Sequence, residues 1–172
     1  ITLAYQPYDE ARRLGLLADT EQQLRKINPG VGVLVVDRVQ PQGPADGLLQ
    51  PGDIVLKAGT EKNKMRWVHG YDVFDALLDD QVNKPIYLTI ERYGKSQQIE
   101  LRVSDLHAIT PDSYISFGEA VVHNLSYQQA RHLNQPVAGI YVAQPGYVLS
   151  AAGVPAGAVI VEINNQAVQN LN

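Results

Sequence analysis

Apolar residues along the chain recur with the periods of strands and of helices, and each period predicts a type of element. Short runs rich in β-branched residues at 32–39 and 54–59 are typical of buried strands. The stretch 71–80 repeats its apolar residues at the spacing of an amphipathic helix, and 84–103 alternates on both sides of a Tyr-Gly-Lys turn. We therefore expect two strands, a helix and a hairpin in this part of the chain.

The N-terminal region predicts a short strand over 1–6, followed by two helices. The first helix, 8–14, carries acidic residues in its first turn and basic residues in its last, which suits the helix dipole. Gly15 stands where a C-terminal cap belongs. The second helix, 18–27, begins at a capping signal and ends before an Asn-Pro-Gly break.

The same pattern of elements returns about 105 residues later. The stretch QPGDIVLKAGT (50–60) aligns with PAGAVIVEINN (155–165), and the loop 13–16 aligns with 116–119. TEQQLRKI likewise matches SYQQARHL, and GVLVV matches AGIYV with a small gap. Because one order of elements occurs twice, we predict two copies of a small fold. The second copy stops a few residues after the aligned stretch, without counterparts of the first copy's last helix and hairpin.

Composition narrows the classes of function. Of the 172 residues, 45 % are hydrophobic and 19 % are charged, as in a globular chain with a buried core. The net charge of −4 argues against a nucleic-acid partner, which needs clustered Lys and Arg. The absence of cysteine excludes disulfides, thiolate metal sites and cysteine nucleophiles, and no apolar run approaches the length of a membrane span. The four histidines are scattered, so we predict neither a metal site nor a cofactor.

The repeat unit consists of an apolar loop with a central glycine, a helix, a strand, a GPA…L…PGDIVL stretch, a helix and a hairpin. In this order, with RRLGL before it and LSYQQAR after it, the unit resembles a PDZ domain of the circularly permuted type found in HtrA/Deg serine proteases. The resemblance covers nearly the whole chain and is closest to the large branch of that family, whose members carry several PDZ modules.

The resemblance implies an α+β fold, a small, partly open β-barrel capped by helices. Two copies are expected, the second truncated at its C-terminal end. The expected domains are a first PDZ domain over 1–105, a linker over 106–115 and an incomplete PDZ-like domain over 116–172.

The resemblance also implies a peptide-binding site. A PDZ groove takes an extended peptide as an added strand, and successive backbone N–H groups of a tight loop hold the terminal carboxylate. The loop residues expected to attract and cradle the carboxylate, and to begin the strand that pairs with the peptide, are Arg13, Leu14, Gly15, Leu16 and Leu17. The residues expected to line the opposite wall, on the helix 71–80, are Phe74, Leu77 and Leu78.

Each of these residues also has a purely structural interpretation. Gly15 can cap the helix 8–14, hold a carboxylate, or do both. The apolar residues of the helix 71–80 have the spacing of ordinary core residues. The arginines at the end of the first helix need no ligand there, and Asp53 follows a Pro-Gly pair, where a turn role is expected.

The second copy departs from the pattern, because its loop reads Phe117-Gly118-Glu119. The carboxylate of Glu119 would repel a C-terminal ligand, so we expect no conventional peptide binding there. The leading hypothesis is a regulatory fragment that recognises C-terminal or extended, unfolded peptide segments for a protease domain elsewhere in the parent chain. The alternative is a structural module that holds a homo-oligomer together or packs against that protease domain.

The sequence contains no serine with the flanking glycines of a protease nucleophile, so we predict that this fragment is not itself an enzyme. The resemblance implies that the parent protein is a serine endopeptidase with a role in protein quality control. The chain begins without Met, and we expect it to be part of something larger. The absence of cysteine, together with the distribution of the family, predicts a location in a bacterial periplasm or cell envelope.

Overall fold

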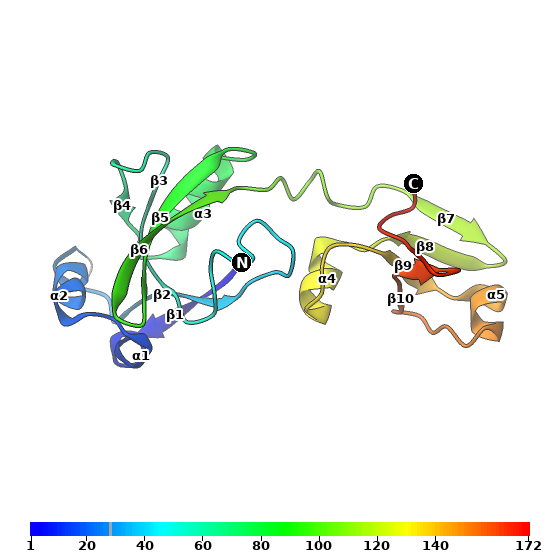
Figure 1. Ribbon diagram of the computed structural model, residues 1–172, viewed down its shortest axis with the longest axis horizontal. Coiled ribbons are helices and arrows are strands. Elements are labelled where there is room, and N and C mark those ends of the chain that lie inside the picture. The colour runs from blue at the N-terminus through cyan, green and yellow to red at the C-terminus, as the bar shows by residue number, and fades with distance from the viewer. Residues whose placement is uncertain (28) are drawn as a thin grey trace. The chain divides into compact units, whose positions relative to one another are not determined.

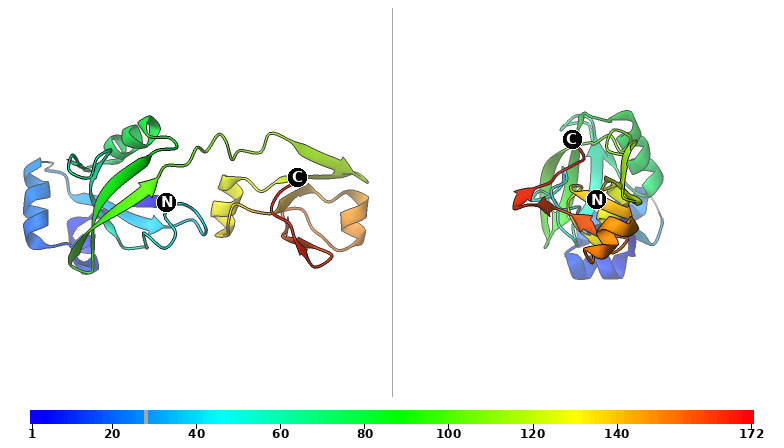
Figure 2. Two further views of the ribbon diagram at one scale, coloured as in Figure 1. Left: turned by 45° about the horizontal axis from the view of Figure 1, so that its top comes forward. Right: turned by 90° about the vertical axis from the view of Figure 1, so that its right-hand side faces the viewer.

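The computed structural model describes residues 1–27 and 29–172, and it divides the chain into two compact units. Unit 1 is Ile1–Asp105 and unit 2 is Leu106–Asn172. Each unit has a sheet and a buried core of its own (Figures 1 and 2).

Unit 1 contains the helices and strands that the sequence pattern predicts. In chain order its described elements are β1 (Thr2–Pro7), α1 (Tyr8–Leu14), α2 (Ala18–Ile27), β2 (Gly32–Arg38), β3 (Ile54–Gly59), β4 (Arg66–Trp67), α3 (Tyr71–Asp80), β5 (Pro85–Arg92) and β6 (Lys95–Arg102). The three helices have the bounds expected from the sequence, and the predicted hairpin is formed by β5 and β6. These predictions are confirmed.

The sheet of unit 1 is antiparallel and open. Its strands lie in the order β1-β2-β3-β5-β6, and the short β4 pairs with β3. β1 and β6 are therefore the two edges. Among the described residues no sheet of the chain closes into a barrel, so the predicted α+β class is confirmed while the barrel is corrected to open sheets.

Both faces of this sheet are covered by helices (Figures 1 and 2). Successive side chains of a strand point to opposite faces. In β2, Leu34 and Val36 pack into the core cluster that contains Phe74 of α3, whereas Val33 and Val35 pack into the cluster that contains α1 and α2 residues. Burial on both faces explains why β2 is a continuous apolar run rather than an alternating one.

Unit 2 is smaller and shares part of this plan. In chain order its elements are β7 (Tyr114–Phe117), β8 (Ala120–Asn124), α4 (Tyr127–Leu133), β9 (Ile140–Gln144), α5 (Gly146–Ala151), β10 (Val159–Ile160), β11 (Glu162–Ile163) and β12 (Gln166–Ala167). The main sheet has the order β10-β9-β8-β7, and β11 pairs with β12. Its core is built around Val122, Ile140 and Val142. β7 begins at Tyr114, inside the stretch 106–115 that was predicted to be a linker.

Candidate functional site

The loop predicted to cradle a carboxylate forms the corner between α1 and α2. Gly15 adopts the left-handed conformation, with φ of 109°, and caps α1 at its C-terminal end. Its N–H donates to the carbonyl oxygens of Ala11 and Arg12. The N–H of Leu16 also donates to Ala11, at 2.9 Å. Both amides therefore close the helix end, as in a Schellman-type cap.

The remaining amide of the corner binds a carboxylate that belongs to the chain itself. The N–H of Leu17 donates to Oε2 of Glu91 at 3.0 Å, and Oγ1 of Thr20 donates to Oε1 at 2.5 Å. Glu91 lies near the end of β5 and is only 2 % exposed. Its negative charge at the start of α2 also suits the helix dipole. The N–H groups of Gly15, Leu16 and Leu17 are thus all occupied within unit 1.

The corner also packs tightly against the β5–β6 turn. A Cβ atom at Gly15 would lie 2.5 Å from the backbone nitrogen of Gly94 and 2.9 Å from Cα of Tyr93. Leu16 is buried among α1, α2, β2 and β3 residues, and α2 begins at Ala18. The prediction that Leu16 and Leu17 begin a strand is therefore wrong, because the chain turns directly into a helix.

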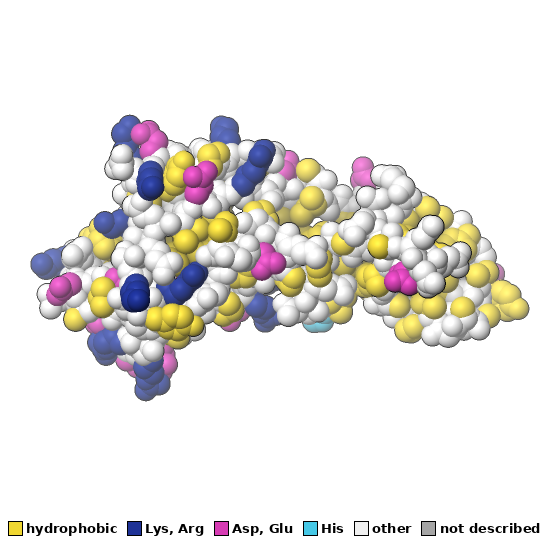
Figure 3. All heavy atoms as spheres, in the orientation of Figure 1, with side chains coloured by type: hydrophobic (Ala, Val, Ile, Leu, Met, Phe, Trp, Pro, Cys, Tyr) yellow, Lys and Arg dark blue, Asp and Glu magenta, His cyan; other side chains and the backbone are white. Residues whose placement is uncertain are grey.

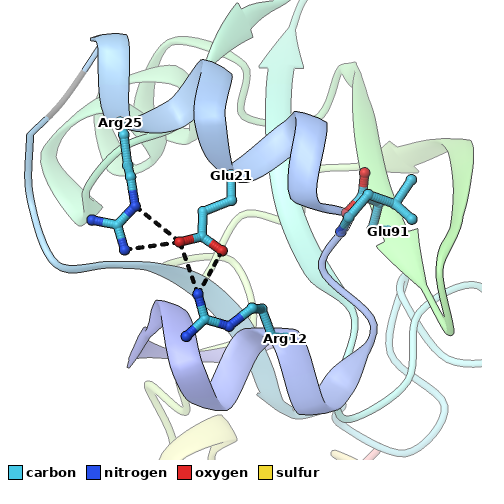
Figure 4. A network of polar contacts seen from close by, with 5 residues as sticks. Arg12, Glu21, Arg25 and Glu91 are labelled. Atoms are coloured by element: carbon cyan, nitrogen blue, oxygen red, sulfur yellow. Dashed lines mark hydrogen bonds and ion pairs between the residues drawn. The ribbon is translucent and has the colours of Figure 1, made fainter.

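The charged residues of the corner pair with one another. Glu21 of α2 accepts from Arg12 of α1 at 3.0 Å and from Arg25 at 2.8 Å (Figure 4). Burial favours the neutral form of Glu21, but the hydrogen bonds from Arg25 and Arg12 outweigh it and lower the pKa of this carboxyl. Arg13 is exposed and pairs with Glu10 at 2.9 Å. The network ties α1 to α2.

Asp53 joins the Pro-Gly turn to the β5–β6 hairpin. Its Oδ2 accepts from the N–H of Gln50 at 2.9 Å, so the expected turn role is confirmed. Its carboxylate, which is fully buried, also takes two hydrogen bonds from Arg92, at 2.7 and 2.6 Å. The hydrogen bonds to Asp53 raise the pKa of Arg92 above its ordinary value. The pair fixes the turn, with Asp53 fully buried and the Arg92 side chain 21 % exposed.

The helical half of the predicted site lies on the other face of the sheet. Phe74 is a core residue at 2 % exposure, and Leu77 and Leu78 pack partly buried against the same core cluster. The corner residues Leu14 and Leu16 belong to the cluster on the opposite face. The structure therefore does not bring the two halves of the predicted site together.

The edge strand β1 is one of the elements that α3 contacts. The hydroxyl of Tyr71, the first residue of α3, donates to the carbonyl oxygen of Leu3 at 3.2 Å. Ile1 and Leu3 pack against the same core cluster as Leu77 and Leu78. Within residues 1–27 and 29–172, β2 is the one strand that pairs with β1, so the other side of β1 is an open strand edge, which α3 reaches through Tyr71. The sequence predicted a strand here but not its place at the edge, because strand order depends on contacts between distant residues.

The corresponding loop of unit 2 is a tight hairpin turn. Gly118 and Glu119 have φ of 50° and 63°, and Phe117 pairs with Ala120 across them. Two left-handed residues in a two-residue loop are typical of a type I′ turn. The carbonyl of Gly118 accepts from the N–H of Tyr147 at 3.1 Å, which fixes the start of α5 against the turn. β8 pairs with β7 on one side and β9 on the other, so it has no free edge.

The two units share a hydrogen-bond pattern where the sequence repeats. The N–H of Gly52 donates to Val36, and the N–H of Gly157 donates to Val142, each at 2.8 Å. In return, the N–H groups of Val36 and Val142 donate to residues 53 and 158 at 2.8 and 2.9 Å. β9 therefore occupies the place of β2, and β8 lies beside β9 as β1 lies beside β2.

Within residues 1–27 and 29–172, no group of three His, Asp or Glu side chains is arranged to hold a metal ion. No helix in the same part of the chain combines the length and the apolar character needed to cross a bilayer.

Comparison with known proteins gives one family model and several curated relatives. The model of the PDZ-like domain matches residues 108–172. The chain is 42 % identical to Protease Do-like 7 of Arabidopsis thaliana over 174 residues, which covers 99 % of the chain and 15 % of the relative. It is 41 % identical to the Pro-apoptotic serine protease NMA111 of Phaeosphaeria nodorum over 170 residues, covering 96 % of the chain and 16 % of the relative. A relative of the same name from Aspergillus clavatus is 36 % identical, with the same coverage.

The organisms of these relatives correct one expectation. They are a plant and fungi and not bacteria, so the predicted bacterial periplasm or cell envelope is wrong. The absence of cysteine fits any redox compartment and carried no information on this point. The chain spans about one sixth of the length of the relatives that it matches.

Proposed function

Because the chain is a PDZ region of the HtrA-like protease family, we propose that unit 1 binds extended peptide segments as an added strand at the free edge of β1, beside α3. The observation that carries this proposal is the contact between Tyr71 of α3 and the backbone of Leu3. It identifies an open strand edge with a helix directly alongside it.

Strand addition requires backbone donors and acceptors that face away from the sheet. The carbonyl of Leu3 is one such group, since it accepts from Tyr71 rather than from β2. Backbone groups along a strand alternate in direction, so those of Tyr5 face the same way. A peptide that pairs here displaces the Tyr71 hydroxyl from Leu3 and forms a ladder along β1.

The helix supplies a wall for the side chains of the peptide. Leu78 follows Tyr71 by two helical turns and therefore lies on the same side of α3. Leu77 and Leu78 are partly exposed, whereas Phe74 supports them from the core. The corner residues Arg13 to Leu17 are outside the proposed site, because their amides already have acceptors or serve the helix cap.

For unit 2 we propose a second copy of the PDZ-like fold. The repeated hydrogen bonds of Gly52 and Gly157 support two copies, with domains over 1–105 and 116–172. Because β8 is paired on both sides, unit 2 is proposed to take part in packing rather than in conventional peptide binding. This is the role that the structural alternative assigns to it.

At the level of the parent chain, we propose a regulatory segment of a serine endopeptidase. The relatives are named as proteases, and this chain corresponds to a small part of each. Peptide capture by unit 1 would hold an extended substrate segment for a catalytic domain elsewhere in the protein, or would signal to that domain that the segment is bound.

The test is a titration of the chain with short peptides that end in apolar residues, each as a free acid and as an amide. Backbone amide shifts in an NMR spectrum should appear in β1 and α3, around Leu3, Tyr5 and Leu78. Leu78→Gln should weaken binding, whereas Ala76→Gln, an exposed position of the same helix, should not. Shifts confined to residues 14–17, or equal effects of the two variants, would contradict the proposal.

A further inference from the structure

Asp75 lies on the side of α3 that borders the open edge of β1. Tyr71 marks that side, because its hydroxyl donates to the carbonyl oxygen of Leu3 at 3.2 Å. In a helix, the residues four and seven positions after Tyr71 lie on the same side, and they are Asp75 and Leu78. Leu78 packs partly buried against the core, whereas Asp75 is exposed. A strand added to β1 would therefore have both an apolar side chain and a carboxylate along its α3 side.

In the described part of the chain, no cation pairs with this carboxylate. The ion pairs of residues 1–27 and 29–172 do not include any carboxylate of α3. β1 has no charged residue, and α3 has four aspartates and neither Lys nor Arg. Basic side chains are nevertheless spread over the visible face of unit 1 (Figure 3). The negative charge beside the β1 edge is therefore a local feature and does not reflect a shortage of basic residues in unit 1.

The charges of α3 are also unfavourable for the helix itself. Asp75 and Asp79 are four positions apart, where like charges repel each other. α1 and α2 carry basic residues in their last turns, which suits the helix dipole, but α3 has none there and carries Asp79 and Asp80 instead. Natural sequences that break such local rules usually do so at functional sites. A positively charged ligand beside α3 would relieve the repulsion.

We propose that the site at the β1 edge prefers peptide segments that carry Lys or Arg at a position facing α3, and that Asp75 determines this specificity. The inference rests on the proposed strand addition at β1 and names the chemistry of the segments that bind there. Complementary charge favours the right partner and like charge disfavours the wrong one, so a segment with Glu at the same position should bind more weakly. Leu78 supplies the apolar contact that segments of either charge would share.

The test uses apolar host peptides of equal length, each with a single Lys, Gln or Glu at one position, and measures affinity from the NMR shifts of backbone amides in β1. Successive side chains of an added strand point to opposite faces, so only every second position faces α3. Moving the Lys one residue at a time should therefore change the affinity with a period of two. At the best position and at low ionic strength, the Lys peptide should bind about two- to fivefold more tightly than the Gln peptide, as expected for an exposed ion pair. The difference should shrink as salt is added.

Asp75→Asn tests the residue, and Asp80→Asn is the matched control. Both aspartates are exposed, so neither substitution should disturb the fold. Asp80 comes nine positions after Tyr71 and therefore lies on the opposite side of α3. Asp75→Asn should remove most of the difference between the Lys and Gln peptides, whereas Asp80→Asn should leave it in place.

The outcomes separate this preference from strand addition itself. The proposal is supported if the Lys preference is lost in Asp75→Asn and kept in Asp80→Asn. It is overturned if Lys, Gln and Glu peptides shift the β1 amides with equal affinity, a result that would leave strand addition standing. It is also overturned if the two variants reduce the preference equally, because the preference would then come from the overall charge of the helix. If no peptide of any charge shifts β1, strand addition fails, and this preference fails with it.

Discussion

Adding a single methyl group at Gly15 tests whether the α1–α2 corner is a packed joint or an open ligand loop. Gly15 has φ of 109°, a conformation that L-residues rarely adopt. The new Cβ would also lie 2.5 Å from the Gly94 nitrogen, which is backbone and cannot rotate away. Gly15→Ala therefore combines conformational strain with a steric clash.

The two costs can be separated with a second glycine. Gly47 has φ of 75°, and a Cβ there meets nothing within 4 Å. Gly47→Ala should cost only the left-handed strain, about 1–2 kcal/mol. Gly15→Ala should cost that amount plus about 1–3 kcal/mol for overpacking against the β5–β6 turn. The expected difference between the variants is therefore about 1–3 kcal/mol in the free energy of unfolding.

Trp67 provides the assay, because it is the single tryptophan of the chain and packs against the same core cluster as Leu14. Urea unfolding followed by its fluorescence reports the stability of unit 1. If Gly15→Ala were no more destabilising than Gly47→Ala, the corner would have room for an added group. The conclusion that it is a packed joint would then be refuted.

Three further changes test other contacts of unit 1. Glu91→Gln should lower the free energy of unfolding by about 1–3 kcal/mol, because it weakens charge-assisted hydrogen bonds, whereas the exposed control Glu100→Gln should change it little in the same urea assay. The pKa of Glu21 is lowered from 4.5, so the contribution of this carboxylate to the free energy of unfolding is fully present above pH 4.5. That contribution is lost as the pH falls through the lower pKa of the folded state. Glu21→Gln should therefore flatten the stability profile below pH 4.5, and an unchanged profile would contradict the assignment. Tyr71→Phe frees the Leu3 carbonyl and should tighten peptide binding by about two- to tenfold in a fluorescence titration; weaker binding would argue against the β1 edge.

The elements of unit 1 could be predicted because their signals are local. α1 combines acidic and basic ends with Gly15 as its cap, and α3 repeats its apolar residues at helical spacing. These signals lie within a few residues of the element that they specify. The bounds of the helices follow from them without knowledge of the rest of the fold.

The site could not be predicted in the same way, because it depends on contacts between distant segments. Glu91 is 74 residues from Leu17, and nothing near either residue indicates that the carboxylate meets this amide. The place of β1 at the sheet edge is equally non-local, since Tyr71 reaches Leu3 across 68 residues. Sequence patterns specify a strand, but the order of strands in a sheet depends on packing.

The loops 13–16 and 116–119 align in sequence, but different elements follow them, and the number of residues after each loop explains the difference. Only two residues separate Gly15 from α2, whereas eight separate Gly118 from α4. Eight residues accommodate the strand β8, but two leave no room for a strand, so the chain enters α2 directly. The place beside β2 is filled instead by β1, which precedes α1. The two loops therefore correspond in sequence but precede different elements, and the strand that corresponds to β8 in unit 1 is the one with the free edge.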